Sequence, residues 1–129
     1  MPMPLPADFV DELSALLGDG WRVDAATCEA HASDDSRRQQ LPEAVALPTT
    51  REQVQAIVRA CRAYRIPIVA QGAGTATTGA AVPVSGGIAL SFSRMNRILD
   101  IRPEDRCAVV EPGMHNGDLQ VALQAHNLF

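Results

Sequence analysis

One stretch of the chain decides the fold: residues 66–79, IPIVAQGAGTATTG. Its first half is an apolar, β-branched run, which predicts a buried strand. Its second half places Gly72, Gly74 and Gly79 among small residues, and glycine lets the backbone turn sharply and approach a ligand closely. Successive backbone N–H groups in such a loop can form a concave nest for an anion, usually a phosphate. The stretch therefore predicts either a pyrophosphate-binding loop or a plain strand-to-loop connection whose glycines serve turns only.

Two familiar phosphate-binding loops do not fit this stretch. A Walker loop needs a lysine that reaches the phosphates, and the chain contains no lysine. A dinucleotide-binding G-x-G-x-x-G motif needs a third glycine where this chain has Thr77, and it must open a helix. Residues 78–83, TGAAVP, are poor helix formers. A phosphate would therefore bind to loop amides rather than to a helix terminus.

A βαβ unit surrounds the stretch. Residues 44–47 form a short apolar strand that ends at Pro48, and Thr49 and Glu52 predict a capping box with Thr49 as N-cap. A helix near residues 50–64 then has one buried stripe, formed by Val54, Ile57, Val58, Cys61 and Tyr64.

The strand at residues 66–70 follows this helix directly. We expect it to run parallel to the strand at residues 44–47, with a right-handed crossover. The glycine-containing loop then leaves the carboxyl end of a parallel strand, where α/β sheets tend to bind ligands.

The N-terminal third of the chain carries weaker signals. Residues 8–17 predict a helix capped by Asp8, with Gly18 as its stop; its apolar face comprises Val10, Leu13, Leu16 and Leu17. A short extended segment at 21–23 precedes a polar, irregular region from Thr27 to Gln40. In that region Asp34 and Asp35 form a carboxylate pair that could suggest acid–base chemistry. We expect instead that both side chains lie in a solvated loop.

The C-terminal third predicts strands and one helix. Residues 88–92 form a strand, and residues 98–101 and 106–111 form a hairpin around a turn with Pro103. Arg94 and Arg97 could clamp an anion, although we expect both to be ordinary exposed arginines in a turn. A final helix begins near Asn116, with a face formed by Leu119, Ala122 and Leu123. The chain then ends on two apolar residues, which suggests an N-terminal piece of a longer protein.

Composition restricts the function classes. A net charge of −4 argues against nucleic acid, and no apolar run is long enough to span a bilayer. The N-terminus lacks the features of a signal peptide, so a cytoplasmic protein is expected. The three cysteines and three histidines have no metal-ligand spacing, so we predict no metal site. Cys61 and Cys107 are expected to be small core residues.

Four ordered motifs resemble a known family. They are residues 41–50 (LPEAVALPTT), 71–75 (QGAGT), 91–98 (SFSRMNRI) and 110–113 (VEPG). They are similar to the FAD-binding half of the vanillyl-alcohol oxidase/p-cresol methylhydroxylase superfamily. Within it they resemble the branch of D-lactate dehydrogenases and glycolate oxidase FAD subunits.

This resemblance implies an α+β fold with a small mixed sheet and flanking helices, forming the first subdomain of a p-cresol methylhydroxylase-type FAD-binding domain. That subdomain would cover residues 33–129, after a helical lead-in at residues 1–32. FAD would bind through the loop, and the segment at Pro48 would lie towards the adenine. The implied cofactor-binding residues are Pro48, Gln71, Gly72, Ala73, Gly74, Thr75, Ala76, Thr78 and Gly79. No catalytic residue is assigned to this chain.

Thr75 departs from the family members that bind FAD covalently. Those members often carry a histidine at this position, in an Arg-Gly-Gly-Gly-His loop, and the resemblance here therefore implies non-covalent FAD. The whole protein would oxidise the α-carbon hydroxyl of a 2-hydroxy acid, of D-lactate or glycolate type, and pass electrons to a quinone or a partner protein. A flavin oxidase acting on another alcohol and a non-catalytic nucleotide-binding fragment are the alternatives. The expected location is cytoplasmic, with possible peripheral attachment to the inner membrane face through partner subunits.

Overall fold

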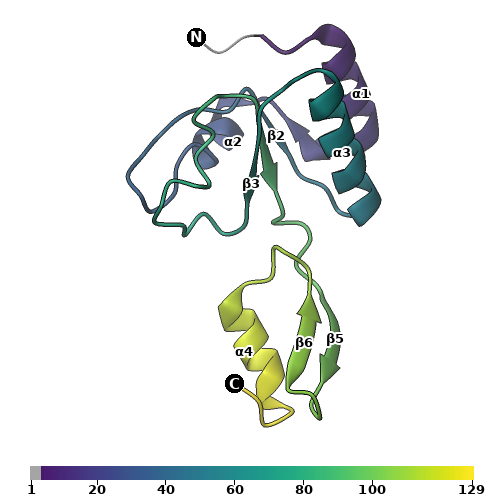
Figure 1. Ribbon diagram of the computed structural model, residues 1–129, viewed down its shortest axis with the longest axis vertical. Helices are drawn as coiled ribbons and strands as arrows, with labels where there is room; N and C mark the ends of the chain where they lie inside the picture. Colours follow the sequence, from purple (N-terminus) through teal and green to yellow (C-terminus); the bar gives the residue numbers. More distant parts are fainter. Residues whose placement is uncertain (1–3) are drawn as a thin grey trace.

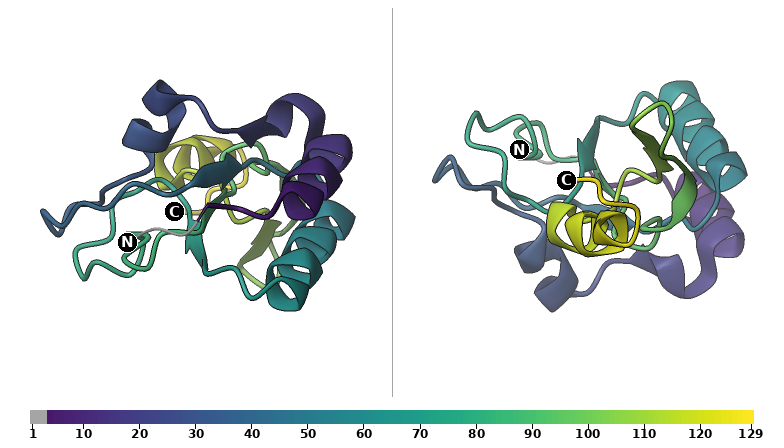
Figure 2. Two further views of the ribbon diagram at one scale, coloured as in Figure 1. Left: turned by 90° about the horizontal axis from the view of Figure 1, so that it is seen from above. Right: turned by 90° about the horizontal axis from the view of Figure 1, so that it is seen from below.

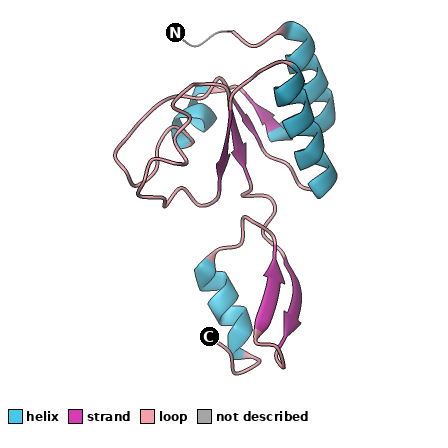
Figure 3. Cartoon of the chain, viewed as in Figure 1, coloured by secondary structure: helices cyan, strands magenta, loops and turns pink. Residues whose placement is uncertain are grey.

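The computed structural model describes residues 4–129 and shows two parts (Figure 1). A four-stranded sheet with helices forms the larger part, and a β-hairpin with one helix forms the smaller part (Figure 3). The elements in chain order are α1 (Ala7–Leu17), the 3-10 helix η1 (Gly18–Gly20), β1 (Trp21–Arg22), α2 (Ala25–Ala30), β2 (Ala44–Ala46), α3 (Arg51–Ala63), β3 (Ile68–Gln71), β4 (Ile88–Ser91), β5 (Ile98–Arg102), β6 (Cys107–Val110) and α4 (Asn116–Gln124). The predicted mixed α+β class is confirmed. Among the described residues, no helix has the length and apolar character needed to cross a membrane.

The larger sheet has the strand order β1-β2-β4-β3. β2 and β3 run in the same direction, as the βαβ pattern predicts, but each pairs with β4, which lies between them. β1 pairs antiparallel with β2 and makes the sheet mixed. All four residues of β4 are buried, because this strand has a neighbour on each side and helices on both faces of the sheet.

The prediction that β3 is a buried strand is wrong. β3 forms an edge of the sheet, and its first three residues are exposed or half-buried. Ile68 is 38% exposed, and Gln71 is the one residue of β3 that is buried. The apolar run was correctly identified as a strand, but its position in the sheet depends on pairing with β4.

One face of the sheet packs against α1 and α3. Phe9, Leu13 and Leu17 of α1 are buried against α3 and the sheet. The Phe9 ring makes edge contacts with Trp21 and Tyr64 at centroid distances of 6.0 and 5.4 Å. The predicted apolar face of this helix omitted Phe9. The helix begins at Ala7, one residue before the predicted cap Asp8, which lies within the first turn.

The N-cap of α3 lies one residue later than predicted. The Thr50 hydroxyl accepts a hydrogen bond from the Gln53 N–H at 3.2 Å, and the Gln53 side-chain oxygen accepts one from the Thr49 N–H at 2.8 Å. Thr49 is therefore not the N-cap, and Glu52 is not the reciprocal partner. The predicted stripe is confirmed at the buried Ile57 and Cys61, and at Val54 and Tyr64, which pack against the core. Val58 is 45% exposed, whereas Ala60, which was not predicted, is buried.

The other face of the sheet packs against α2, a helix that falls partly in the region predicted to be irregular. Asp24 caps it by accepting a hydrogen bond from the Thr27 N–H at 3.0 Å. Cys28 is buried against Val45 and Ala89. The six-residue helix has no apolar stripe, and this explains why periodicity did not predict it.

The smaller part contains the predicted hairpin and the final helix, which begins at Asn116 as expected. Cys107 is exposed, contrary to the prediction that it is a core residue. Pro103 is the first residue of the hairpin turn, and its carbonyl accepts a hydrogen bond from the Arg106 N–H at 3.2 Å.

The two parts meet where the chain enters the hairpin and leaves it. The buried Glu111 carboxylate accepts hydrogen bonds from the Arg97 backbone and guanidinium at 2.7–3.1 Å. These bonds keep the pKa of the Glu111 carboxyl below its ordinary value. Arg94 pairs with Asp19 at 3.1 Å. Both arginines that could have clamped an anion therefore pair with carboxylates of the chain itself.

Candidate cofactor-binding loop

The glycine loop, defined here as residues 72–79, leaves the carboxyl end of β3 and carries no charged side chain. Gly74 and Gly79 have φ values of 75° and 82°, in the left-handed region that favours glycine. A Cβ built on Gly74 would meet no atom within 4 Å. Gly74 is therefore glycine for its backbone conformation, and the space around its Cα is open.

The backbone N–H groups of this loop are available to a ligand. Between residues 4 and 129, the amides of residues 72–78 donate to no backbone carbonyl and to no side chain. Buried amides are almost always hydrogen-bonded, so a run of free amides is tolerated only where water or a ligand reaches them. Gly72, Ala73, Thr75 and Thr78 are exposed accordingly. An uncharged loop of free amides is the arrangement that a phosphate nest requires.

Gln71 fixes the shape of the loop. Its buried side-chain amide donates to the carbonyl oxygens of His31 and Ala81, both at 2.8 Å. Its backbone carbonyl accepts from the Phe92 N–H at 3.0 Å. Gln71 therefore ties the start of the loop to the chain that follows it and to the end of α2, and its side chain is already hydrogen-bonded within the protein.

A second loop, residues 33–39, supports the glycine loop from the side. An isolated bridge between Ser33 and Gln39 closes it, and the Asp35 N–H donates to the Ala76 carbonyl at 2.9 Å. The two loops project together from the same side of the sheet (Figure 2). We call residues 33–39 the arginine loop, because Arg37 and Arg38 lie in it.

Asp34 anchors the arginine loop, and the expectation that it is solvated is wrong. It is only 9% exposed, and its Oδ1 accepts from the Ser36 N–H at 2.8 Å. Hydrogen bonds from Ser36 keep the pKa of the Asp34 carboxyl below its ordinary value, whereas Oδ2 has no partner among residues 4–129. The Asp-x-Ser spacing is typical of an Asx-turn and is the sequence signal that could have indicated this role. Asp35 is exposed, as expected.

The structure brings together most, but not all, of the residues that the sequence suggested. Residues 71–79 form one continuous loop, in which the Ala76 carbonyl is bonded to Asp35 and the Thr78 hydroxyl accepts from the Ala80 N–H at 3.4 Å. Pro48 follows β2 at the same carboxyl edge of the sheet, with β4 between β2 and β3, and its side chain is fully buried.

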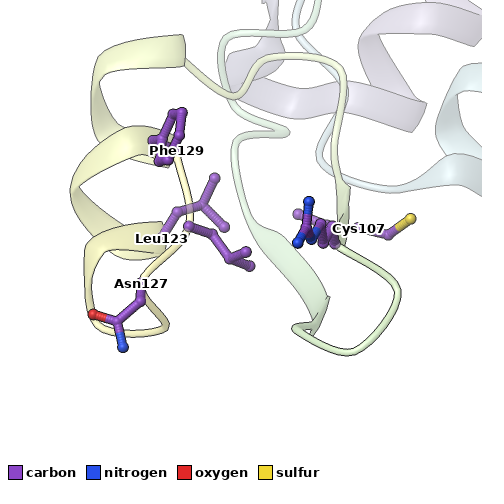
Figure 4. A pocket seen from close by; sticks show the side chains of 7 residues that line it. Cys107, Leu123, Asn127 and Phe129 are labelled. Carbon is purple, nitrogen blue, oxygen red and sulfur yellow. The ribbon is translucent and has the colours of Figure 1, made fainter.

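The histidines, cysteines and acidic residues in the described part of the chain are the candidate ligands for a metal site. The described part of the chain has no group of three or more His, Cys, Asp or Glu residues that could hold a metal ion. Burial raises the pKa of the Cys61 thiol to about 11, so this thiol stays protonated at neutral pH. A hollow of about 560 Å³ lies between β6 and α4, where Leu123 and Phe129 are found, and the Cys107 sulfur points away from the helix (Figure 4). It shares no residue with the glycine loop.

A family model described as an FAD-binding domain matches residues 42–129, which include β2, the glycine loop and the hairpin. The chain belongs to this FAD-binding family. The predicted cofactor, FAD, is thereby confirmed at the level of the family. The free amides and the open space at Gly74 fit such a cofactor, since a pyrophosphate needs hydrogen-bond donors and close backbone approach.

Individual relatives agree with the family assignment. The chain is 43% identical over 88 residues to the glycolate oxidase subunit GlcD of Escherichia coli (strain K12), covering 68% of this chain and 18% of that protein. It is 35% identical to the D-2-hydroxyglutarate dehydrogenase of Stutzerimonas stutzeri (strain A1501), covering 94% of this chain and 26% of that protein. The structure of p-cresol methylhydroxylase with substrate bound matches with a TM-score of 0.82 and 31% identity, over 99% of this chain and 27% of the other. The chain thus spans about a quarter or less of the length of these relatives. Their names agree with the predicted superfamily resemblance, which is confirmed.

Proposed function

We propose that the glycine loop binds the pyrophosphate of FAD non-covalently. The observation that carries this proposal is the run of free amides from residue 72 to residue 78 in a loop without charged side chains. Gly72, Ala73, Gly74 and Thr75 would donate directly, with Thr78 and Gly79 nearby, while Gln71 and Ala76 would hold the loop in shape. The segment around the buried Pro48 would lie towards the adenine.

We further propose that the whole protein is an FAD-dependent oxidoreductase acting on a 2-hydroxy acid, with glycolate and D-lactate as the expected type. Glycolate oxidase and D-2-hydroxyglutarate dehydrogenase among the relatives support this substrate class. The flavin, when bound, supplies the two-electron oxidation, and the role of this chain is to bind and orient the cofactor. Residues 33–129 would form the first of two FAD-binding subdomains, after the lead-in at residues 1–32.

The electron acceptor and the location are also proposals. We expect a quinone or a partner protein to accept the electrons, in a cytoplasmic protein or one held at the inner membrane face by partner subunits. The alternative is a flavin oxidase that acts on another alcohol, such as a sugar or a lactone precursor. Phenols are a third substrate class to test, because p-cresol methylhydroxylase shares the fold. Anaerobic bleaching of the flavin by glycolate, D-lactate or D-2-hydroxyglutarate, but not by p-cresol, would favour the hydroxy-acid class. The reverse pattern would overturn it.

The attachment of FAD can be tested directly. A histidyl-flavin link needs an imidazole nitrogen, and Thr75 offers only a hydroxyl. Each amide or hydroxyl hydrogen bond contributes about 1 kcal/mol to the free energy of binding, and somewhat more when the acceptor is a charged phosphate. A cofactor held only by such bonds dissociates when the protein unfolds. The natural full-length protein should therefore be denatured in acid and pelleted, and flavin absorbance measured in both fractions. We expect all flavin in the supernatant as free FAD. Yellow colour in the washed pellet would show a covalent link through another residue.

A further inference from the structure

The arginine loop places a cation beside the uncharged glycine loop. Arg38 lies against Gly79: the position that a Cβ would take on Gly79 is 3.2 Å from Arg38 Cδ and 3.7 Å from Arg38 Nε. The Asp35–Ala76 hydrogen bond holds the two loops together near this contact. The Arg38 side chain therefore lies where the glycine loop ends.

Arg38 is free to bind an anion. Four arginines pair with carboxylates at 2.7–3.1 Å, namely Arg22, Arg94, Arg97 and Arg102. Arg38 is exposed and forms no ion pair with any residue from 4 to 129. The neighbouring carboxylate of Asp34 instead accepts from the Ser36 N–H. A guanidinium with free donors can bind two phosphate oxygens at once, which makes arginine a preferred phosphate ligand.

A cation beside the glycine loop would strengthen the binding of a diphosphate. The diphosphate carries two negative charges, whereas residues 71–82 contain no charged side chain and the chain has a net charge of −4. Amide dipoles alone would have to stabilise both charges at a loop that solvent reaches. We propose that Arg38 binds the diphosphate of the cofactor and supplies its positive counter-charge across the glycine loop. This inference rests on the proposed function, because it assumes that the glycine loop binds a diphosphate.

The test compares variants of the natural full-length protein in its apo form. Arg38→Ala removes the charge, Arg38→Lys keeps the charge but not the planar donor pair, and Arg59→Ala is the matched control. Arg59 is exposed on α3, which packs on the sheet away from the loops, and it forms no ion pair with a described residue. The dissociation constant for FAD is measured by flavin fluorescence titration at about 50 mM and about 500 mM NaCl, since salt screens a solvent-exposed charge. Thermal unfolding of each apo variant shows whether the fold is unchanged.

We expect Arg38→Ala to weaken FAD binding about 10- to 100-fold at low salt and by a clearly smaller factor at high salt. Arg38→Lys should fall between this variant and the parent, and Arg59→Ala should stay within about twofold. If the parent protein binds FAD and Arg38→Ala binds it equally well, the role of Arg38 is refuted and the glycine loop is not. A loss that is the same at both salt concentrations would also refute it, because a purely structural role does not depend on screening. If the parent binds no FAD, the proposed function itself fails.

Discussion

Two glycine-containing turns lie at opposite ends of the β3–β4 strand pair, and their surroundings differ. Gly74, in the loop after β3, and Gly87, in the turn before β4, both have left-handed backbones, with φ values of 75° and 72°. A Cβ on Gly74 would meet nothing, whereas a Cβ on Gly87 would overlap the carbonyl of Pro67. The Gly87 N–H and carbonyl are both hydrogen-bonded to Glu43, while the amides of residues 72–78 have no partner within the described chain.

The contrast separates two uses of glycine that a sequence pattern does not distinguish. In the turn before β4, glycine permits close packing of one backbone on another, and the fold needs it. In the glycine loop, it leaves the backbone open on one side, so that a ligand can approach. Substitutions should therefore damage stability in the first case and cofactor binding in the second.

Gly87→Ala should have the largest effect. A left-handed backbone costs a non-glycine residue about 1–2 kcal/mol, and forcing a methyl group into packed atoms costs about 1–3 kcal/mol more. We expect the free energy of unfolding, measured by urea denaturation, to fall by about 2–5 kcal/mol. Gly117→Ala is the matched control, since a Cβ there meets nothing and the residue lies in α4; it should be neutral or stabilising by up to about 1 kcal/mol. Equal stability of Gly87→Ala and the parent would contradict this account.

Gly74→Asp should abolish cofactor binding while leaving the fold intact. Asp and Asn both tolerate a left-handed backbone, so Gly74→Asn controls for conformation and Gly74→Asp adds only the charge. Like charges about 4–5 Å apart repel by about 3–4 kcal/mol at an effective dielectric constant of about 20, which corresponds to a loss of at least about 100-fold in affinity. FAD content of the purified full-length variants, with thermal unfolding as the fold check, gives the answer. Normal FAD content in a well-folded Gly74→Asp variant would refute the proposed nest.

Much of the fold could be predicted because its signals are local. The turn residues predicted the hairpin, and the apolar runs on either side of α3 predicted two parallel strands. The exposure of β3 could not be predicted in this way, because residues 66–70 and 88–92 are similarly apolar runs. Which of them is central depends on the pairing of β4 with both β2 and β3, which is a long-range property.

The candidate site was predictable to a similar extent. The position of the glycine loop at the carboxyl end of a strand followed from the βαβ pattern. Its contacts with the arginine loop did not, because Asp35 and Ala76 are far apart in the chain and no local pattern links them. The structural role of Gln71 was also missed, since its two acceptors, His31 and Ala81, are backbone carbonyls that carry no side-chain signal.

Gln71→Glu tests whether the open loop depends on its hydrogen-bonded base. The carboxylate cannot donate to the two carbonyls that the amide serves, and the lost bonds leave buried acceptors without partners. We expect the free energy of unfolding to fall by about 2–3 kcal/mol, with weaker FAD binding as a consequence. Gln55→Glu, the same change at an exposed position of α3, should alter stability by less than about 0.5 kcal/mol. If both variants behave alike, Gln71 does not hold the loop.

The smallest expected effect is a pH dependence of the free energy of unfolding. It should arise at the turn before β4 and not at the glycine loop. Burial raises the pKa of the Glu43 carboxyl above its ordinary value of 4.5, so the folded state binds this proton more tightly than the unfolded state does. By proton linkage, the contribution of Glu43 to stability is full below pH 4.5 and declines as the pH rises through the folded-state pKa. Glu43→Gln removes this titration.

The measurement is a difference between two proteins across the pH range. The free energy of unfolding of the parent minus that of Glu43→Gln should decrease as the pH rises from about 4 and level off once the folded-state carboxyl is ionised. The glycine loop contains no titratable side chain, so the same difference for Gly74→Asn should not vary with pH. Since both comparisons share every other titrating group, the contrast isolates Glu43. A Glu43→Gln difference that increases with pH would show that the hydrogen bond from the Gly87 N–H, which favours the ionised carboxylate, outweighs the cost of burying its charge.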